Sequence, residues 1–257
     1  MGVYTTEIAS DKIASDNPIH QRLLKAYYLA VEHIKGDLLE IGCGEGRGID
    51  LLQPKCTSYT AIDKIQGVID NLSKSYPDVH FIQDNIPPFS KIEDNSFDTI
   101  VTFQVIEHIK NDRLFLEEIK RILRPGGKAL ISTPNIKLTL TRNPWHIREY
   151  TAEQLTNLAK DVFSYVEMKG VGGNEKIMAY HEANRKSVKK ITRFDILNLQ
   201  HKLPAPLLRI PYDILNRLNR NKLKSANNSL VNEISHTDYL LTDKADAALD
   251  LFLIVKK

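Results

Sequence analysis

The chain has 257 residues, of which 42% are hydrophobic and 26% are charged, and this balance fits one large globular domain rather than a disordered or fibrous chain. Its only cysteines, Cys43 and Cys56, are too few for a disulfide framework, so we expect a reducing, cytoplasmic setting. The sequence shows neither an apolar leader nor a run of about 18 apolar residues, and we therefore expect neither secretion nor membrane spanning.

A helical segment is predicted over residues 1–36, ahead of the sheet. Asn17-Pro18 is typical of a helix N-cap followed by proline at the first helical position. Apolar residues then recur at helical spacing from Leu23 to Val31.

Short apolar runs bounded by turn residues follow this helix, and each predicts a buried parallel strand. The clearest helix between them is predicted over residues 112–123, before Pro125-Gly126-Gly127 ends it. The alternation of strands and helices predicts a doubly wound α/β sheet. The five strands are predicted at residues 38–41, 59–62, 79–82, 97–103 and 128–132.

The C-terminal part of the chain adds to this sheet. The stretch from Thr151 to Gln154 has the form of a capping box and opens another helix. Residues 163–168 and 249–255 predict two further strands, which we expect to pair antiparallel. The sheet would then have seven strands, mostly parallel, with its main domain at residues 37–169 and its final strand within 239–257.

Residues 170–238 interrupt the pattern, and we interpret them as a helical cap inserted before the last strand. From Lys176 to Lys224 the chain holds twelve Lys and Arg residues against three acids. Such a concentration suggests an anionic substrate, a membrane surface or a nucleic acid as partner, although a solvated helical face explains it equally well. An apolar stripe in this segment either faces a membrane-associated or anionic acceptor, with arginines nearby, or packs on the sheet domain; it comprises Leu207, Ile214, Leu215 and Leu218, beside Arg209, Arg217 and Arg220.

The first strand-to-helix turn is rich in glycine. In an open α/β sheet the ligand binds outside the carboxyl ends of the strands, so this turn is the place to look for a site. Alternating glycines let the backbone bend tightly and approach a ligand with no Cβ in the way. A dinucleotide fingerprint would need glycine at position 47, where the chain has Arg47, and Glu40 would repel a pyrophosphate. The turn therefore favours a ligand with a cation and no phosphate; its residues are Glu40, Ile41, Gly42, Cys43, Gly44, Glu45 and Gly46.

Polar residues also end the next two strands. Asp63 follows the second strand and can accept hydrogen bonds from two ribose hydroxyls. Asp84 and Asn85 follow the third, and they offer an acceptor and an amide suited to adenine. Each feature has a structural alternative, since either aspartate can instead cap a helix.

Taken in order, these motifs resemble those of the class I methyltransferases that use S-adenosylmethionine (SAM), particularly the broad subgroup that includes quinone-biosynthesis and sugar-tailoring enzymes. The resemblance covers about residues 20–168 and the last strand, and its motifs lie at residues 39–46, 97–108 and 123–127. It implies a Rossmann-like fold, SAM as the cofactor and methyl transfer as the activity. The cofactor contacts that it implies are Glu40, Gly42, Cys43, Gly44 and Gly46 at the methionine part, Asp63 at the ribose, Asp84 and Asn85 at the adenine, and Phe103 and Gln104 beside the methionine.

A hydroxyl acceptor would benefit from a general base. His146 is the best candidate because it follows a strand tip and histidine titrates near neutrality, although a structural or substrate-orienting role is the alternative. Arg148 and Glu149 can pair with each other. His108 is expected to be a packing or capping histidine.

Several acceptors and cofactors are disfavoured. Family members that methylate amino groups of nucleic acids commonly carry an Asn/Asp-Pro-Pro-aromatic motif after the fourth strand, whereas this chain has Phe103-Gln104-Val105-Ile106. The Asp/Asn triad that holds Mg²⁺ in catechol-type enzymes has no evident counterpart, so we expect no metal. We favour O-methylation of a small molecule, sugar, or glycan or lipid-linked intermediate, with peripheral membrane contact as an option. The alternatives are a nicotinamide-dependent oxidoreductase and a SAM-binding module without turnover.

Overall fold

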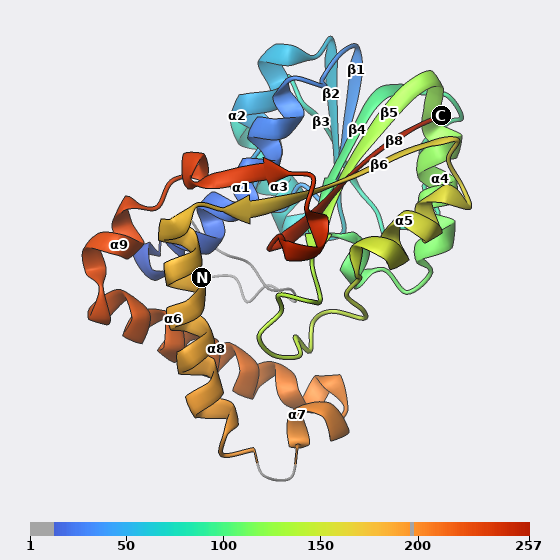
Figure 1. Ribbon diagram of the computed structural model, residues 1–257. Coiled ribbons are helices and arrows are strands. Elements are labelled where there is room, and N and C mark those ends of the chain that lie inside the picture. The colour runs from blue at the N-terminus through green and yellow to red at the C-terminus, as the bar shows by residue number, and fades with distance from the viewer. Residues whose placement is uncertain (1–12, 196–197) are drawn as a thin grey trace.

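A computed structural model of the chain describes residues 13–195 and 198–257. The part of the predicted N-terminal segment that precedes residue 13 lies outside these residues. Strands and helices alternate along the first part of the chain (Figure 1). The strands are β1 (Asp37–Ile41), β2 (Ser58–Asp63), β3 (His80–Gln83), β4 (Phe97–Phe103), β5 (Leu123–Pro134), β6 (Tyr165–Gly173), β7 (Tyr239–Thr242) and β8 (Asp250–Lys256). The helices are α1 (Asn17–Val31), α2 (Ile49–Leu52), α3 (Gln66–Ser75), α4 (Asp112–Ile122), α5 (Ala152–Lys160), α6 (Glu175–Thr192), α7 (Leu199–Lys202), α8 (Ala205–Ala226) and α9 (Asn228–Glu233).

The strands form one mixed sheet in the order β3-β2-β1-β4-β5-β8-β6-β7. β1 pairs in parallel with β2 and β4, β2 with β3, and β4 with β5. β8 lies antiparallel between β5 and β6, which confirms the expected antiparallel pair. The fold is therefore α/β and Rossmann-like, with the carboxyl ends of β1 to β4 on one edge of the sheet.

The prediction of seven mostly parallel strands is wrong in its details. Within the described residues the sheet has eight strands, because residues 239–257 contain two strands instead of one. β6 also continues to Gly173, and its last residues, Gly170 to Gly173, pair antiparallel with β7. β7 is only four residues long and flanked by polar residues, so its sequence carries no clear strand pattern.

The two faces of the sheet carry separate hydrophobic cores, because successive side chains of a strand point to opposite faces. Leu39 and Ile41 of β1 pack with α4 and α5, whereas Leu38 packs with α1, α2 and α3. In β8, Leu253 and Ile254 divide in the same way. Figure 1 shows these helices on the two sides of the sheet.

The start of α1 is tied to the segment between β6 and β8. Asp16, and not Asn17, occupies the N-cap position, and its side chain makes no capping hydrogen bond. Asn17 instead donates to the carbonyls of Val231 and Ile234 at 2.8 and 2.9 Å. The predicted cap at Asn17 is therefore wrong, because its amide is used to fasten the α9 region to α1.

Below the sheet in Figure 1, α6, α7, α8 and α9 occupy the segment predicted to form the cap. They lie beyond the end of β6, on the side where the loop after β5 emerges. Among the described residues no helix combines the length and the apolar character needed to cross a bilayer.

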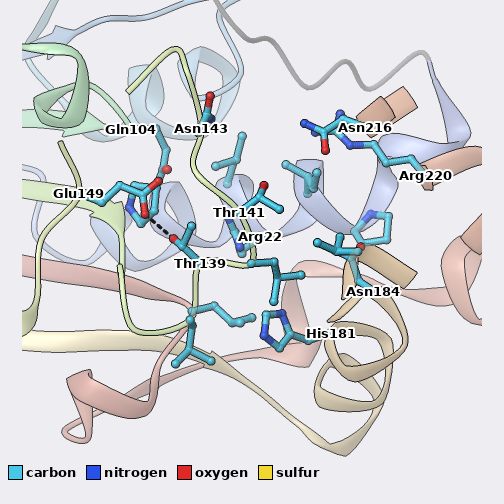
Figure 2. A pocket seen from close by; sticks show the side chains of 18 of the residues that line it. Arg22, Gln104, Thr139, Thr141, Asn143, Glu149, His181, Asn184, Asn216 and Arg220 are labelled. Carbon is cyan, nitrogen blue, oxygen red and sulfur yellow. Dashed lines mark hydrogen bonds between the residues drawn. The ribbon is translucent and has the colours of Figure 1, made fainter. Parts of the chain in front are cut away.

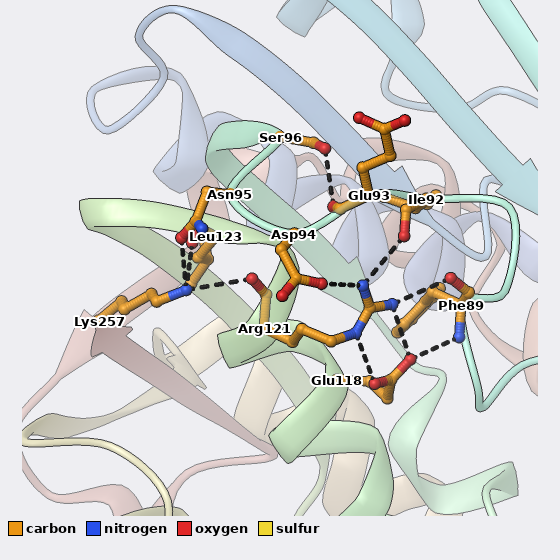
Figure 3. Close-up of polar contacts among 10 residues, drawn as sticks. All are labelled: Phe89, Ile92, Glu93, Asp94, Asn95, Ser96, Glu118, Arg121, Leu123 and Lys257. Atoms are coloured by element: carbon orange, nitrogen blue, oxygen red, sulfur yellow. Dashed lines mark hydrogen bonds and ion pairs between the residues drawn. The ribbon is translucent and has the colours of Figure 1, made fainter.

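Arg121 lies near the end of α4, just before β5 begins, and makes several polar contacts there (Figure 3). Its guanidinium pairs with Asp94 at 2.7 Å and with Glu118 at 2.7 Å. It also donates to the carbonyls of Phe89 and Ile92, both at 3.0 Å. The fork of this one side chain therefore holds the connection between β3 and β4 against α4.

Candidate active site

The glycine turn after β1 has the conformation that its sequence predicts. Gly42, Gly44 and Gly46 have φ angles of 75°, 50° and 79°, which disfavour residues with a Cβ. A Cβ on Gly42 would come within 2.4 Å of Val105, so Val105 packs directly against the turn. At Gly44 no described atom would lie within 4 Å of a Cβ, so there the turn has room for a ligand.

Glu40 and Cys43 support this turn from within the core. Glu40 is 1% exposed, and it accepts hydrogen bonds from the hydroxyls of Tyr27, at 2.7 Å, and Tyr59. Burial raises the pKa of Glu40 to about 7, against the opposing effect of these two hydrogen bonds. Cys43 is 3% exposed. Both side chains thus hold the turn in place, and neither lies on its open side.

Asp63 joins the tips of β1 and β2. Its Oδ2 accepts from the backbone N–H of Gly44 at 3.0 Å, and its Oδ1 accepts from that of Ile65 at 3.0 Å. The carboxylate is only partly buried, so its remaining lone pairs can accept hydroxyl donors beside the glycine turn.

Asp84 and Asn85 lie at the tip of β3. The backbone N–H of Asp84 donates to the carbonyl of Asp63 at 3.1 Å, which brings the two strand tips together. Asp84 Oδ1 accepts from the N–H of Asn85 at 2.8 Å, whereas the buried Oδ2 has no hydrogen-bond partner in the described part of the chain. Such an atom costs free energy until a donor reaches it. Asn85 itself is exposed.

Phe103, the last residue of β4, and Gln104, the residue after it, point in different directions. Phe103 packs in the core, edge-on to Tyr27 with ring centroids 4.9 Å apart. Gln104 has a φ of 58° and turns its side chain into a cavity of about 250 Å³. Of this pair, only Gln104 lines the cavity.

Of the predicted cofactor residues, Phe103, Glu40 and Cys43 are buried in the core, whereas the glycine turn, Asp63 and Asp84 lie along one edge that fits SAM. Gly44 has room for the ligand, Asp63 retains acceptor capacity, and Asp84 offers a buried acceptor that lacks a donor. Adenine carries an amine that can supply this donor.

The cavity beyond Gln104 lies between this edge and α6 and α8 (Figure 2). Hydroxyl, amide and cationic side chains converge on it from the loop after β5 and from the helices. These side chains are Arg22, Thr139, Thr141, Asn143, His181, Asn184, Asn216 and Arg220.

His146 lines the same cavity, and both of its ring nitrogens have assigned roles. Nδ1 lies 2.6 Å from Glu149 Oε1, and Nε2 lies 3.0 Å from Asn143 Nδ2. Asn143 Oδ1 accepts from the N–H of Trp145 at 3.0 Å, which fixes the orientation of the Asn143 amide. Nδ1 thus donates to the carboxylate, and Nε2 presents its lone pair.

The expected pairing of Arg148 with Glu149 is not found. Arg148 pairs with Asp112, and Glu149 accepts from His146 and from the hydroxyl of Thr139. Figure 2 shows the Thr139 contact beside the cavity. Glu149 is thereby free of the arginine and is held against the imidazole.

Sequence reasoning missed Glu107 and favoured a packing or capping role for His108. Glu107 is fully buried, and its Oε2 accepts from the hydroxyl of Thr133 at 3.0 Å. Its Oε1 has no hydrogen-bond partner among the described residues, and burial raises its pKa to about 7. The His108 ring meets the His146 ring edge-on at 5.0 Å. The signal was an adjacent Glu-His pair directly after a strand tip.

The arginines of the basic segment are engaged within the fold. Arg217 and Arg220 pair with the buried Asp16 at 2.7 and 3.2 Å. Arg209 lies over the ring of Trp145, 4.4 Å from its centroid. These contacts correct both expectations for the arginines, since they are neither a set of solvent-facing charges nor simply neighbours of an apolar stripe.

The apolar stripe itself does not pack on the sheet domain. Leu207 and Leu218 are 64% and 60% exposed, and Ile210 is 72% exposed. Leu207, Ile214 and Leu218 are thus largely exposed, whereas Leu215, the fourth member of the stripe, lines a cavity beside α6 and α7.

Comparisons with known proteins agree with this geometry. Residues 39–131 match the family described as "Methyltransferase domain". A "Probable S-adenosylmethionine-dependent methyltransferase" of Mycobacterium tuberculosis is 37% identical over 131 residues, which cover 49% of this chain and 47% of that protein. A "Ubiquinone biosynthesis O-methyltransferase" of Rickettsia conorii is 26% identical over 133 residues, covering 50% of this chain and 44% of that protein. The chain spans about half the length of the relatives that it matches.

The fold also matches solved structures. A SAM-dependent methyltransferase of Thermotoga maritima, described as a possible histamine N-methyltransferase, superposes with a TM-score of 0.58 at 14% identity. The match covers 93% of this chain and 91% of that one. At this identity the likeness shows the fold and not the acceptor.

Proposed function

We propose that the chain is a class I SAM-dependent methyltransferase and that it O-methylates a hydroxyl-bearing small molecule, sugar, or glycan or lipid-linked intermediate. The observation that carries the proposal is the position of Gln104. It ends β4 at the cofactor edge and lines the cavity that also contains His146. A methyl donor at this edge and an acceptor in this cavity would be neighbours.

The edge residues would hold SAM, which supplies a methyl group on a positively charged sulfur. Gly44 leaves space for the ligand, while Glu40 and Cys43 position the turn from below. Asp63 would accept the ribose hydroxyls, and the unpaired Asp84 oxygen would accept the adenine amine. Positioning is the main requirement of this reaction, because bringing the two reactants together can supply about 7–11 kcal/mol.

The composition of the cavity supports a polar acceptor. Asn184 and Asn216 reach it from α6 and α8, and Thr139 and Thr141 reach it from the loop after β5 (Figure 2). Amides and hydroxyls both donate and accept hydrogen bonds, which suits a molecule with several hydroxyls. Arg22 also lines the cavity, where it pairs with the buried Asp250 at 3.2 Å.

His146 would activate the acceptor hydroxyl. Its Nδ1 donates to Glu149, so Nε2 carries the ring lone pair that a hydroxyl proton would need. Asn143 donates to this nitrogen in the structure and would release it when the acceptor binds.

A lipid-linked acceptor is supported by a second cavity. This cavity, of about 350 Å³, shares Thr141, Tyr212 and Asn216 with the first. Its other walls include Ile191, Phe194, Leu199, Leu208, Pro211 and Leu215. A polar head beside His146 could thus continue into an apolar tail, and the exposed stripe of α8 could touch the membrane that holds such a lipid.

The test is to titrate the purified chain with SAM, with its demethylated product and with NADH. We expect the first two to bind and NADH not to bind. Methyl-labelled SAM added to cell extracts should then label a hydroxyl-bearing product. NADH binding without SAM binding would restore the oxidoreductase alternative, and SAM binding without any labelled product in the extracts would favour a module without turnover.

A further inference from the structure

Three potential metal ligands meet at the wall of the acceptor cavity, where the sequence analysis expected no metal. Glu107, His108 and His146 each bring a ligand atom within 4.8 Å of the other two. We propose that they bind one divalent transition-metal ion, which holds and acidifies the acceptor hydroxyl. This inference rests on the proposed methyl transfer, because it concerns the same acceptor.

Glu107 is the strongest single reason to place a cation here. Its side chain is fully buried, and one of its oxygens, Oε2, accepts a hydrogen bond from Thr133. The other oxygen has no hydrogen-bond partner in the part of the chain that the structure describes. A buried carboxylate with an unpaired oxygen is costly, and a cation bound to that oxygen would remove the penalty.

Both histidines have the outer contacts that metal-binding histidines need. His108 Nδ1 lies 2.9 Å from the carbonyl of Trp145, which can only accept, so Nδ1 carries the hydrogen and Nε2 the lone pair. His146 Nδ1 donates to Glu149, so the lone pair lies on Nε2, where the Asn143 amide donates to it at 3.0 Å and would be displaced by an ion. A hydrogen bond from the second ring nitrogen to a carbonyl or carboxylate is the usual outer contact of a histidine that binds a metal.

The backbone holds the two loops together at this point. The N–H of Ile147 donates to the carbonyl of Glu107 at 2.8 Å, and the N–H of Arg148 donates to the same oxygen at 3.3 Å. His146 is therefore fixed beside Glu107 and His108 although it lies on a different loop. Metal bonds of about 2.0–2.2 Å in a tetrahedral site place the ligand atoms roughly 3.5 Å apart, so the two loops would draw together when an ion binds.

The donor set indicates which ions fit. Two imidazoles and one carboxylate suit Zn²⁺, Fe²⁺ and their neighbours in the first transition row, and they leave coordination positions open. An acceptor hydroxyl at such a position would lose its proton to water more easily. Its oxygen would then form the C–O bond as the methyl–sulfur bond breaks and leaves its electron pair on sulfur. With an ion bound, the Nε2 lone pair of His146 would serve as a ligand, and the ion would take the place of direct proton transfer to His146 in the proposed reaction.

The experiment is a metal titration of tag-free protein that has been treated with chelator and dialysed. Co²⁺ is the probe, because its visible absorption reports bound nitrogen ligands, and emission spectroscopy gives the stoichiometry. We expect one equivalent to bind to the unmodified chain. Glu107→Gln and His108→Gln should each weaken binding by more than about 100-fold, beyond the loss typical of an outer contact. The controls are the exposed residues His80 and Glu117, changed to Gln.

The outcomes separate this inference from the proposed function. Unchanged Co²⁺ binding in both site variants, or no binding by the unmodified chain, would overturn the metal site, even if SAM bound and methyl transfer proceeded after chelation. Metal binding without SAM binding would instead overturn the methyltransferase assignment of the site. If a variant fails to fold, the unmodified chain still decides, because Zn²⁺ should raise its melting temperature.

Discussion

The Nδ1 atom of His146 lies 2.6 Å from the Oε1 atom of Glu149, three residues later on the same loop. The other carboxylate oxygen of Glu149 accepts a hydrogen bond from the hydroxyl of Thr139. This contact fixes which nitrogen of His146 carries the hydrogen, and it directs the other nitrogen to the acceptor side. The reactivity of His146 should therefore depend on Glu149.

Substitutions of this pair should slow methyl transfer without loss of SAM affinity. His146→Ala is expected to lower kcat by roughly 10²–10⁴-fold. Glu149→Gln keeps the shape but not the carboxylate, and it should lower kcat by about 10–100-fold. Steady-state kinetics with the identified acceptor would measure both, with the exposed Glu153→Gln as the control. A rise in acceptor KM at an unchanged kcat would show that His146 orients the acceptor and does not activate it.

Cofactor affinity should depend on the two aspartates at the strand tips. Asp63→Ala removes a charged acceptor from the ribose and should cost about 1.5–3 kcal/mol of SAM binding. Asp84→Asn places an amide donor near the adenine amine and should weaken binding by a similar amount. The demethylated product should be affected equally, because it shares the ribose and adenine. Calorimetry would measure these affinities, with the exposed Asp70→Asn as the reference; an unchanged Kd in either site variant would remove that residue from the cofactor site.

The sequence was most informative where one short stretch determines both conformation and chemistry. The glycine turn needs positive φ at Gly42, Gly44 and Gly46, and only the backbone and its nearest neighbours decide this. Because parallel strands end at the same edge of a sheet, the residues that follow β1, β2 and β3 could be expected to lie close together. The cofactor edge could therefore be predicted residue by residue.

The acceptor side could not be predicted in this way, because it depends on contacts between distant segments. Glu107 and His146 meet only because the loop after β5 folds back onto the end of β4. Arg217 looked like a surface charge in the sequence, yet it pairs with Asp16, which precedes α1. The short strand β7 depends on pairing with the glycine end of β6. None of these pairings has a local sequence pattern.

Arg121 should be the most sensitive charged residue at the end of the sheet far from the cofactor edge. Arg121→Ala leaves the carbonyls of Phe89 and Ile92 and the carboxylate of Glu118 without this donor (Figure 3). The expected loss is about 2–3 kcal/mol in the free energy of unfolding. Arg121→Lys should recover only a small part of it, because a lysine cannot reproduce the fork.

Urea denaturation would measure these losses. The control is Arg113→Ala, since Arg113 makes only exposed contacts with Glu117 and Asp161, and exposed pairs contribute about 0–1 kcal/mol. Equal losses for Arg113→Ala and Arg121→Ala would show that the network of Arg121 contributes no more than a surface ion pair.

Glu40 should make the stability of the chain depend on pH. Burial raises the pKa of Glu40 from 4.5 to about 7 in the folded state, whereas in the unfolded chain the carboxyl titrates near its ordinary value. Between these values the folded state binds more protons than the unfolded state, so the free energy of unfolding falls as pH rises. The stabilising contribution is thus complete below about pH 4.5 and lost above about pH 7, and its size is of the order of 3 kcal/mol.

Glu40→Gln separates this effect from other titrations, because glutamine has nearly the same shape but does not ionise. Relative to the unmodified chain, the variant should gain stability as the pH is raised from 5 to 8. Glu107 shifts in the same direction by burial, but it is present in both proteins and largely cancels from the difference. Thermal unfolding without SAM at several pH values would measure the difference, with the exposed Glu32→Gln as the control. Parallel curves for the unmodified chain and Glu40→Gln would mean that Glu40 stays ionised across this range, with the hydroxyls of Tyr27 and Tyr59 compensating fully for its burial.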